Sequence, residues 1–151
     1  DAFLQYSPYV YYNEHCIDKT QPYDGISDLL SFLKKEHFHI CILSNKTDEL
    51  TKKIAKKLFA ENTFDIVQGA VPAVPRKPNP TAAINIAQKL NINCQQILYV
   101  GDTNIDIETA KKAGMYAVGC TWGFRTKEEL IKAYAELIID HPSDLITFLK
   151  D

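Results

Sequence analysis

The chain has 151 residues, 46% hydrophobic and 24% charged, with a formal net charge of −2. This length is typical of about one globular domain, and the balanced charge gives no indication of a nucleic-acid or membrane partner. The apolar runs are too short to cross a bilayer, and the four cysteines are far apart without a C-x-x-C pair, so we expect reduced thiols in a cytoplasmic protein, a monomer or homodimer.

The first twenty residues are rich in aromatic side chains and do not follow the pattern of the rest of the chain. Pro22 and Gly25 separate them from a helix that is predicted by apolar residues at helical spacing: Ile26, Leu29, Leu30 and Leu33. We therefore expect residues 1–20 to be the end of a separate element that is cut off at its start.

Apolar runs then alternate with amphipathic segments. The expected strands are residues 38–44, 64–70, 96–102, 116–120 and 137–140. The expected helices are residues 47–59, residues 79–90 with Asn79 as cap, a segment ending at Gly114, one starting near Lys127, and a last one capped by Ser143. Nearly all-apolar strands are typical of a sheet buried on both faces, so the chain predicts an α/β fold with a doubly wound parallel sheet. Such folds bind ligands at the carboxyl ends of their strands.

The segment ILSNKTDE, residues 42–49, allows two interpretations. Asn-Lys-Thr-Asp fits the N-K-x-D pattern that recognises guanine in GTP-binding proteins, but the chain has no phosphate loop of the form G-x-x-x-x-G-K-[ST]. The other interpretation is that Ser44 ends a strand, so that its hydroxyl and the N–H groups after it hold a phosphate. A plain helix cap is the structural alternative for this serine.

Lys77 lies in the proline-rich stretch PRKPNP, where the following proline favours extended backbone at the lysine. An ammonium group placed there can neutralise phosphate charge. The alternative is a surface lysine in a turn.

Asp102 and Asp106 form a G-D-x-x-x-D pattern just after an expected buried strand. One helical turn separates them, so both carboxylates can face one point, and Mg²⁺ takes one or two carboxylates together with phosphate and water. The alternative is that one or both acids cap the helix.

In order and spacing, these residues resemble the haloacid dehalogenase superfamily of phosphatases: Ser44 matches its second motif, Lys77 its third, and Asp102 with Asp106 its fourth. Residues 21–46, 118–130 and 138–145 further resemble phosphoglycolate phosphatases. The resemblance implies a Rossmann-like core over residues 21–151, with residues 1–20 as the last piece of a helical cap. It also implies a Mg²⁺-dependent phosphatase acting on a small phosphorylated metabolite, with Ser44, Asn45 and Lys77 binding phosphate and Asp102 and Asp106 binding the metal.

The first motif of that superfamily, an Asp-x-Asp at the end of the central strand, is missing. No two aspartates in the chain are separated by one residue. The resemblance therefore implies that the nucleophile lies outside this chain, that the core lacks its central strand, and that the chain is an inactive fragment. Direct pairing of the flanking strands or a strand from a partner chain could fill the gap. A non-catalytic module that binds phosphate or a protein is the alternative function.

Overall fold

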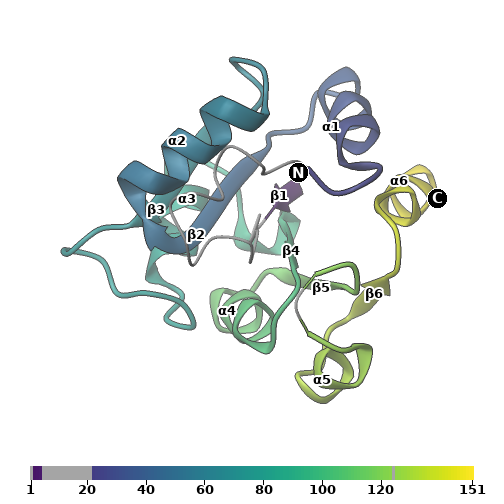
Figure 1. Ribbon diagram of the computed structural model, residues 1–151. Helices are drawn as coiled ribbons and strands as arrows, with labels where there is room; N and C mark the ends of the chain where they lie inside the picture. Colours follow the sequence, from purple (N-terminus) through teal and green to yellow (C-terminus); the bar gives the residue numbers. More distant parts are fainter. Residues whose placement is uncertain (1, 5–21, 124) are drawn as a thin grey trace.

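The computed structural model of the chain describes residues 2–4, 22–123 and 125–151. Its strands are β1 (Ala2–Leu4), β2 (Cys41–Thr47), β3 (Ile66–Ala70), β4 (Leu98–Gly101), β5 (Tyr116–Cys120) and β6 (Leu137–Ile139). Its helices are α1 (Ile26–Lys35), α2 (Asp48–Leu58), α3 (Thr81–Leu90), α4 (Asn104–Ala113), α5 (Lys127–Lys132) and α6 (Pro142–Lys150), with a short 3₁₀ helix at Cys94–Gln96. The strands form one parallel sheet in the order β3-β2-β1-β4-β5-β6 (Figure 1). The predicted α/β fold with a doubly wound parallel sheet is confirmed.

The centre of the sheet is occupied, contrary to the expectation that its central strand is missing. β1 pairs with β2 through Leu4 and Ile42, and with β4 through three residue pairs. It thereby gives both neighbours backbone partners, which a gap would deny to their N–H and C=O groups. Residues 2–4 thus belong to the core sheet, whereas the rest of the expected cap segment, up to residue 20, lies outside the described residues.

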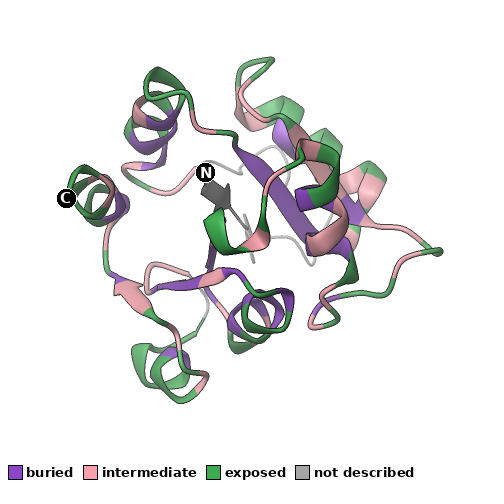
Figure 2. Ribbon diagram, turned by 180° about the vertical axis from the view of Figure 1, so that it is seen from behind, coloured by how far each residue is buried: buried purple, intermediate pink, exposed green. Residues whose placement is uncertain are grey.

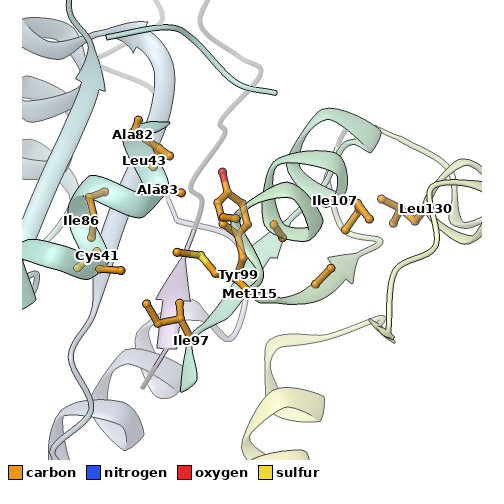
Figure 3. Close-up of a cluster of buried hydrophobic side chains, with 14 residues drawn as sticks. Cys41, Leu43, Ala82, Ala83, Ile86, Ile97, Tyr99, Ile107, Met115 and Leu130 are labelled. Carbon is orange, nitrogen blue, oxygen red and sulfur yellow. The ribbon is translucent and has the colours of Figure 1, made fainter. Parts of the chain in front are cut away.

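Hydrophobic clusters cover both faces of the sheet. Tyr99 and Ala117 belong to one cluster, and the residues next to them, Val100 and Val118, belong to the other. This alternation follows from the opposite directions of successive strand side chains. The first cluster includes side chains of α3, α4 and α5 (Figure 3), and the second includes side chains of α1 and α6. Burial on both faces explains why the strands are nearly continuous apolar runs.

The helices turn their exposed residues outward and their buried residues toward this core (Figure 2). Within the described ranges, no helix is both long enough and apolar enough to span a bilayer. The described cysteines, Cys41, Cys94 and Cys120, are free thiols.

Two of the predicted helix caps are wrong by one or two residues. α3 begins at Thr81, and Asn79 accepts the N–H of Thr81 at 2.9 Å from one residue ahead of the cap position. His141 caps α6, and its ring Nδ1 accepts the N–H of Ser143 at 3.1 Å. Pro142 suits the first helical position because its missing N–H is not needed there, so Ser143 lies inside the helix rather than before it.

Candidate functional site

Ser44 lies inside β2, not directly before a helix as expected, because β2 continues to Thr47. The pairing of β2 with β3 shifts register between Leu43 and Thr47. The buried Ser44 accepts the N–H of Lys46 at 3.1 Å. The N-terminus of α2 is instead capped by Thr47, which accepts the N–H of Leu50 at 3.3 Å. The helix-cap alternative for Ser44 therefore fails.

Lys77 is buried, with 8% of its surface exposed, so the alternative of a surface lysine fails as well. Its ammonium contacts the Asp106 carboxylate at 2.8 Å, in an ion pair shielded from water. The backbone of Lys77 is held by the side chain of Asn45, which accepts its N–H at 2.9 Å and donates to its C=O at 3.1 Å. Ser44, Asn45 and Lys77 also line one small cavity. β2 and the segment before α3 thus meet at this point.

Asp102 directly follows β4, and Asp106 lies in the first turn of α4. Both are buried. The second oxygen of Asp106 accepts the N–H of Asp102 at 3.1 Å and both the N–H and hydroxyl of Thr103, at 3.2 and 3.1 Å. The Thr103 hydroxyl oxygen accepts the N–H of Asp106 at 3.2 Å, which completes a capping box. Asp106 therefore both caps the helix and pairs with Lys77, so the two interpretations of this residue do not exclude each other.

Two glycines allow backbone to approach these carboxylates closely. A Cβ atom on Gly101 would lie 2.2 Å from the Cβ of Asp106, and one on Gly123 would lie 2.2 Å from an oxygen of Asp102. Real Cβ atoms do not come so near. Neither glycine was expected at the site, although Gly101 stands in the G-D-x-x-x-D pattern. Thr103 was not expected there either, although T-x-x-D is a recognisable capping-box pattern.

Two further polar groups lie in the field of the acid pair. Burial, and then the charges of Asp106 and Asp102, raise the pKa of the Tyr99 hydroxyl well above its ordinary value. Burial, and then the charges of Asp102 and Asp106, likewise raise the pKa of the Cys120 thiol. Both groups therefore stay neutral, and Cys120 is not a thiolate nucleophile.

The acid pair fits Mg²⁺ in its donor atoms. Among the described residues, no three or more His, Cys, Asp or Glu side chains gather as a metal site. One or two carboxylates suffice for Mg²⁺, however, when phosphate and water complete the shell. Each oxygen of Asp106 already accepts from Lys77 or from the Asp102–Thr103 segment. Asp106 is accordingly less suited to direct contact with a metal.

The comparison with protein families decides the relationship. The family model described as haloacid dehalogenase-like hydrolase matches residues 5–120. The chain belongs to this family. The resemblance noted from Ser44, Lys77, Asp102 and Asp106 is therefore confirmed at the level of the family.

Within the haloacid dehalogenase-like hydrolases, the chain is similar to phosphoglycolate phosphatases. It is 32% identical to that of Aquifex aeolicus over 139 residues, 92% of this chain and 64% of the relative, and 28% identical to that of Escherichia coli K12, again over 92% of this chain but 55% of the relative. The crystal structure of a candidate phosphoglycolate phosphatase from Lactobacillus delbrueckii subsp. bulgaricus matches with a TM-score of 0.83 and 33% identity, covering 89% of this chain and 56% of that one. The chain thus spans less than two thirds of these relatives.

The strand β1 lacks the first motif that the family resemblance implies. β1 lies between β2 and β4, where the resemblance to the superfamily implies an Asp-x-Asp, but its residues are Ala-Phe-Leu and contain no carboxylate. The expected nucleophile is therefore not on the strand described at this position.

A wider hollow lies between α4 and α5 and is lined mainly by charged side chains. Its acids pair with its bases: Glu108 with Lys112 at 3.1 Å and Glu129 with Arg125 at 3.8 Å. Ser44, Lys77, Asp102 and Asp106 are not among its lining residues. The candidate site is therefore the buried cluster at the carboxyl edge of the sheet.

Proposed function

We propose that a longer protein carrying this chain hydrolyses a small phosphate monoester with the help of Mg²⁺. The observation that carries the proposal is the buried ion pair of Lys77 with Asp106, beside Asp102 and next to Ser44, at the edge where parallel sheets bind ligands. Burying two carboxylates and an ammonium carries a desolvation cost that ion pairing and hydrogen bonds must offset, so such clusters are retained mainly where a site needs them. The relatives named as phosphoglycolate phosphatases support the same reaction class.

Each residue has a separate task in this proposal. Ser44 holds oxygens of the phosphoryl group, and Lys77 offsets the negative charge that builds up on them. Asp102 is the metal ligand, and Asp106 keeps the Lys77 ammonium in place. Bound Mg²⁺ supplies further positive charge at the phosphoryl oxygens.

The nucleophile in this proposal is an aspartate outside the 151 residues. Its carboxylate attacks phosphorus and displaces the alcohol of the ester, and water then cleaves the aspartyl-phosphate to release inorganic phosphate.

Phosphoglycolate is the first candidate substrate, on the strength of the relatives alone. Rates of phosphate release across phosphorylated metabolites, measured with and without Mg²⁺, would identify the substrate. Efficient turnover of sugar phosphates or nucleotides but not of phosphoglycolate would reject the narrower assignment while leaving the phosphatase class intact.

The metal role of Asp102 gives a direct test in the longer protein. We expect hydrolysis of p-nitrophenyl phosphate to require Mg²⁺, and Asp102→Ala to lower kcat by at least about 100-fold, because a ligand lost from a metal site costs more than an outer contact does. Asp140→Ala is the matched control, since Asp140 also directly follows a strand of the sheet, β6, but is exposed. Full activity of Asp102→Ala, or activity that survives chelation, would refute the metal assignment.

One observation favours a second candidate function, a module that binds phosphate or a protein without turnover. No Asp-x-Asp pair exists anywhere in the 151 residues, whereas the groups proposed to hold phosphate are all present. Reading the coding region upstream of Asp1 would discriminate: an Asp-x-Asp strand there supports the enzyme, and its absence supports the module.

A further inference from the structure

We propose that Asn45 is a positioning residue, whose amide holds the backbone of Lys77 so that the lysine ammonium stays beside Asp106 and the phosphoryl group. The inference rests on the proposed phosphatase function and assigns to Asn45 a role within it that acts through Lys77. It is an alternative to the expectation that Asn45 binds phosphate directly.

The contact between Asn45 and Lys77 uses both ends of one amide. The Asn45 oxygen accepts the Lys77 N–H at 2.9 Å, and the Asn45 nitrogen donates to the Lys77 C=O at 3.1 Å. A side-chain amide presents an acceptor and a donor together, which matches the N–H and C=O of one residue. Aspartate would keep only the acceptor, and alanine would keep neither. The Asn45 oxygen and one N–H of its amide nitrogen are thus both engaged with the Lys77 backbone.

The segment that carries Lys77 needs such a contact. Residues 71–80 connect β3 to α3 and contain only turns and bends, without helix or strand bonds to fix their course. Asn45 lies in β2, between Leu43 and Thr47, the two residues whose pairing with β3 flanks the register shift. The two hydrogen bonds therefore tie a segment without helix or strand to a strand of the sheet.

Lys77 is consequently fixed at both ends. Asn45 holds its backbone, and Asp106 holds its ammonium at 2.8 Å. Asp106 is in turn fixed by three hydrogen bonds from Asp102 and Thr103. A long, flexible side chain is thus held in one position before substrate arrives, which is the condition for electrostatic stabilisation without reorganisation.

The contact itself can be tested on the 151-residue chain without any catalysis. We expect Asn45→Ala to speed hydrogen exchange of the Lys77 amide at least about tenfold, because that N–H loses its acceptor, and Asn45→Asp, which keeps an acceptor, to give an intermediate rate. Asn79→Ala is the matched control, since Asn79 bonds the N–H of Thr81 in the same region. Unchanged Lys77 exchange in Asn45→Ala would overturn the proposal.

The catalytic consequence is tested in the longer protein. We expect Asn45→Ala to lower kcat roughly 10- to 100-fold, as a small misplacement of a catalytic group does, with KM and inhibition by inorganic phosphate changed less than about threefold. If Asn45 were a direct phosphate ligand, its loss would instead raise KM and weaken inhibition by inorganic phosphate. In a Lys77→Met background the effect of Asn45→Ala should vanish, because Asn45 acts through the ammonium.

The outcomes separate the two proposals. An active parent protein with faster Lys77 exchange but unchanged kcat in Asn45→Ala would refute the positioning role. The same holds if the kcat losses of Asn45→Ala and Lys77→Met simply multiply. An inactive parent protein would refute the phosphatase function and the positioning role with it, while the exchange rates would still establish whether the contact exists.

Discussion

Single residues at this site are packed so closely that small changes should be costly. Asp106 lies directly over Gly101, and its carboxylate bonds Lys77, Thr103 and the Asp102 backbone at once. The glycine is thus needed for space, not for an unusual backbone angle. Gly123 has the same relation to Asp102, which links the loop after β5 to the acid pair.

Replacing Gly101 by alanine tests this packing independently of any activity. The new methyl would fall 2.2 Å from the Cβ of Asp106, so the α4 start must move, and we expect a loss of about 1–3 kcal/mol in the free energy of unfolding. Gly119→Ala in β5 is the matched control, because its methyl would meet Leu130 at 3.2 Å and needs only a slight shift. Urea denaturation measures both variants. Equal stability of the two would contradict the close approach of Asp106.

At the scale of elements, α2 is joined to β3 by Asp48. One Asp48 oxygen accepts the Gly69 N–H at 2.9 Å and the other accepts from Lys52 at 2.7 Å. The helix can come this near because Gly69 has no side chain. A Cβ atom at this position would lie 2.5 Å from the Thr51 hydroxyl oxygen. The bond from Lys52, and then that from the Gly69 N–H, lower the pKa of Asp48.

This lowered pKa makes stability depend on pH. A carboxylate whose pKa is lower in the folded state stabilises the fold above its unfolded pKa of about 4, and the contribution is lost as pH falls through the folded pKa. We expect Asp48→Asn, which keeps an oxygen acceptor for Gly69, to cost about 0.5–1 kcal/mol at pH 7 and progressively less as pH falls through the lowered pKa of Asp48 in the folded state. Asp48→Ala should cost about 1–2 kcal/mol at pH 7, because the Gly69 N–H also loses its partner. Urea denaturation from pH 7 down into the acid range measures both, and an Asp48→Asn deficit that does not shrink as the pH falls would contradict the assignment.

The elements also show which features a sequence can predict. Residues 38–44 and 96–102 were recognisable as strands because burial on both faces leaves a local apolar pattern. β1 was missed, since three residues carry no period and their strand state follows from pairing with β2 and β4. The extension of β2 to Thr47 was missed for the same reason, because its register against β3 is not a local property.

The candidate site divides in the same way. Asp102 and Asp106 were paired from their spacing, since four residues on a helix form one turn. The bonds between Asn45 and Lys77 join residues 32 positions apart and leave no local pattern. The sequence could therefore nominate Asn45 for the site but not its partner.

For the whole molecule, the parallel sheet is what gathers the site. Every described strand runs in the same direction, so all their carboxyl ends lie at one edge. The site residues, which are spread over the chain from Ser44 to Asp106, thus come together there. The sheet is buried on both faces by helices, which makes it a rigid support for a charged cluster (Figure 2).

This arrangement contains the groups proposed to hold phosphate but not the Asp-x-Asp expected to supply the nucleophile, and the chain should behave accordingly. β1 has no carboxylate and no Asp-x-Asp occurs in the sequence, so we expect the purified 151-residue chain to hydrolyse p-nitrophenyl phosphate no faster than buffer, with or without Mg²⁺. Without a nucleophile to attack phosphorus and form the covalent intermediate, the positioned charges have no transition state to stabilise. Release of p-nitrophenolate measures the rate, and the Asp102→Ala chain, purified in parallel, reports any contaminating phosphatase. Turnover present in the parent chain but lost in that variant would show that another residue within these 151 is the nucleophile.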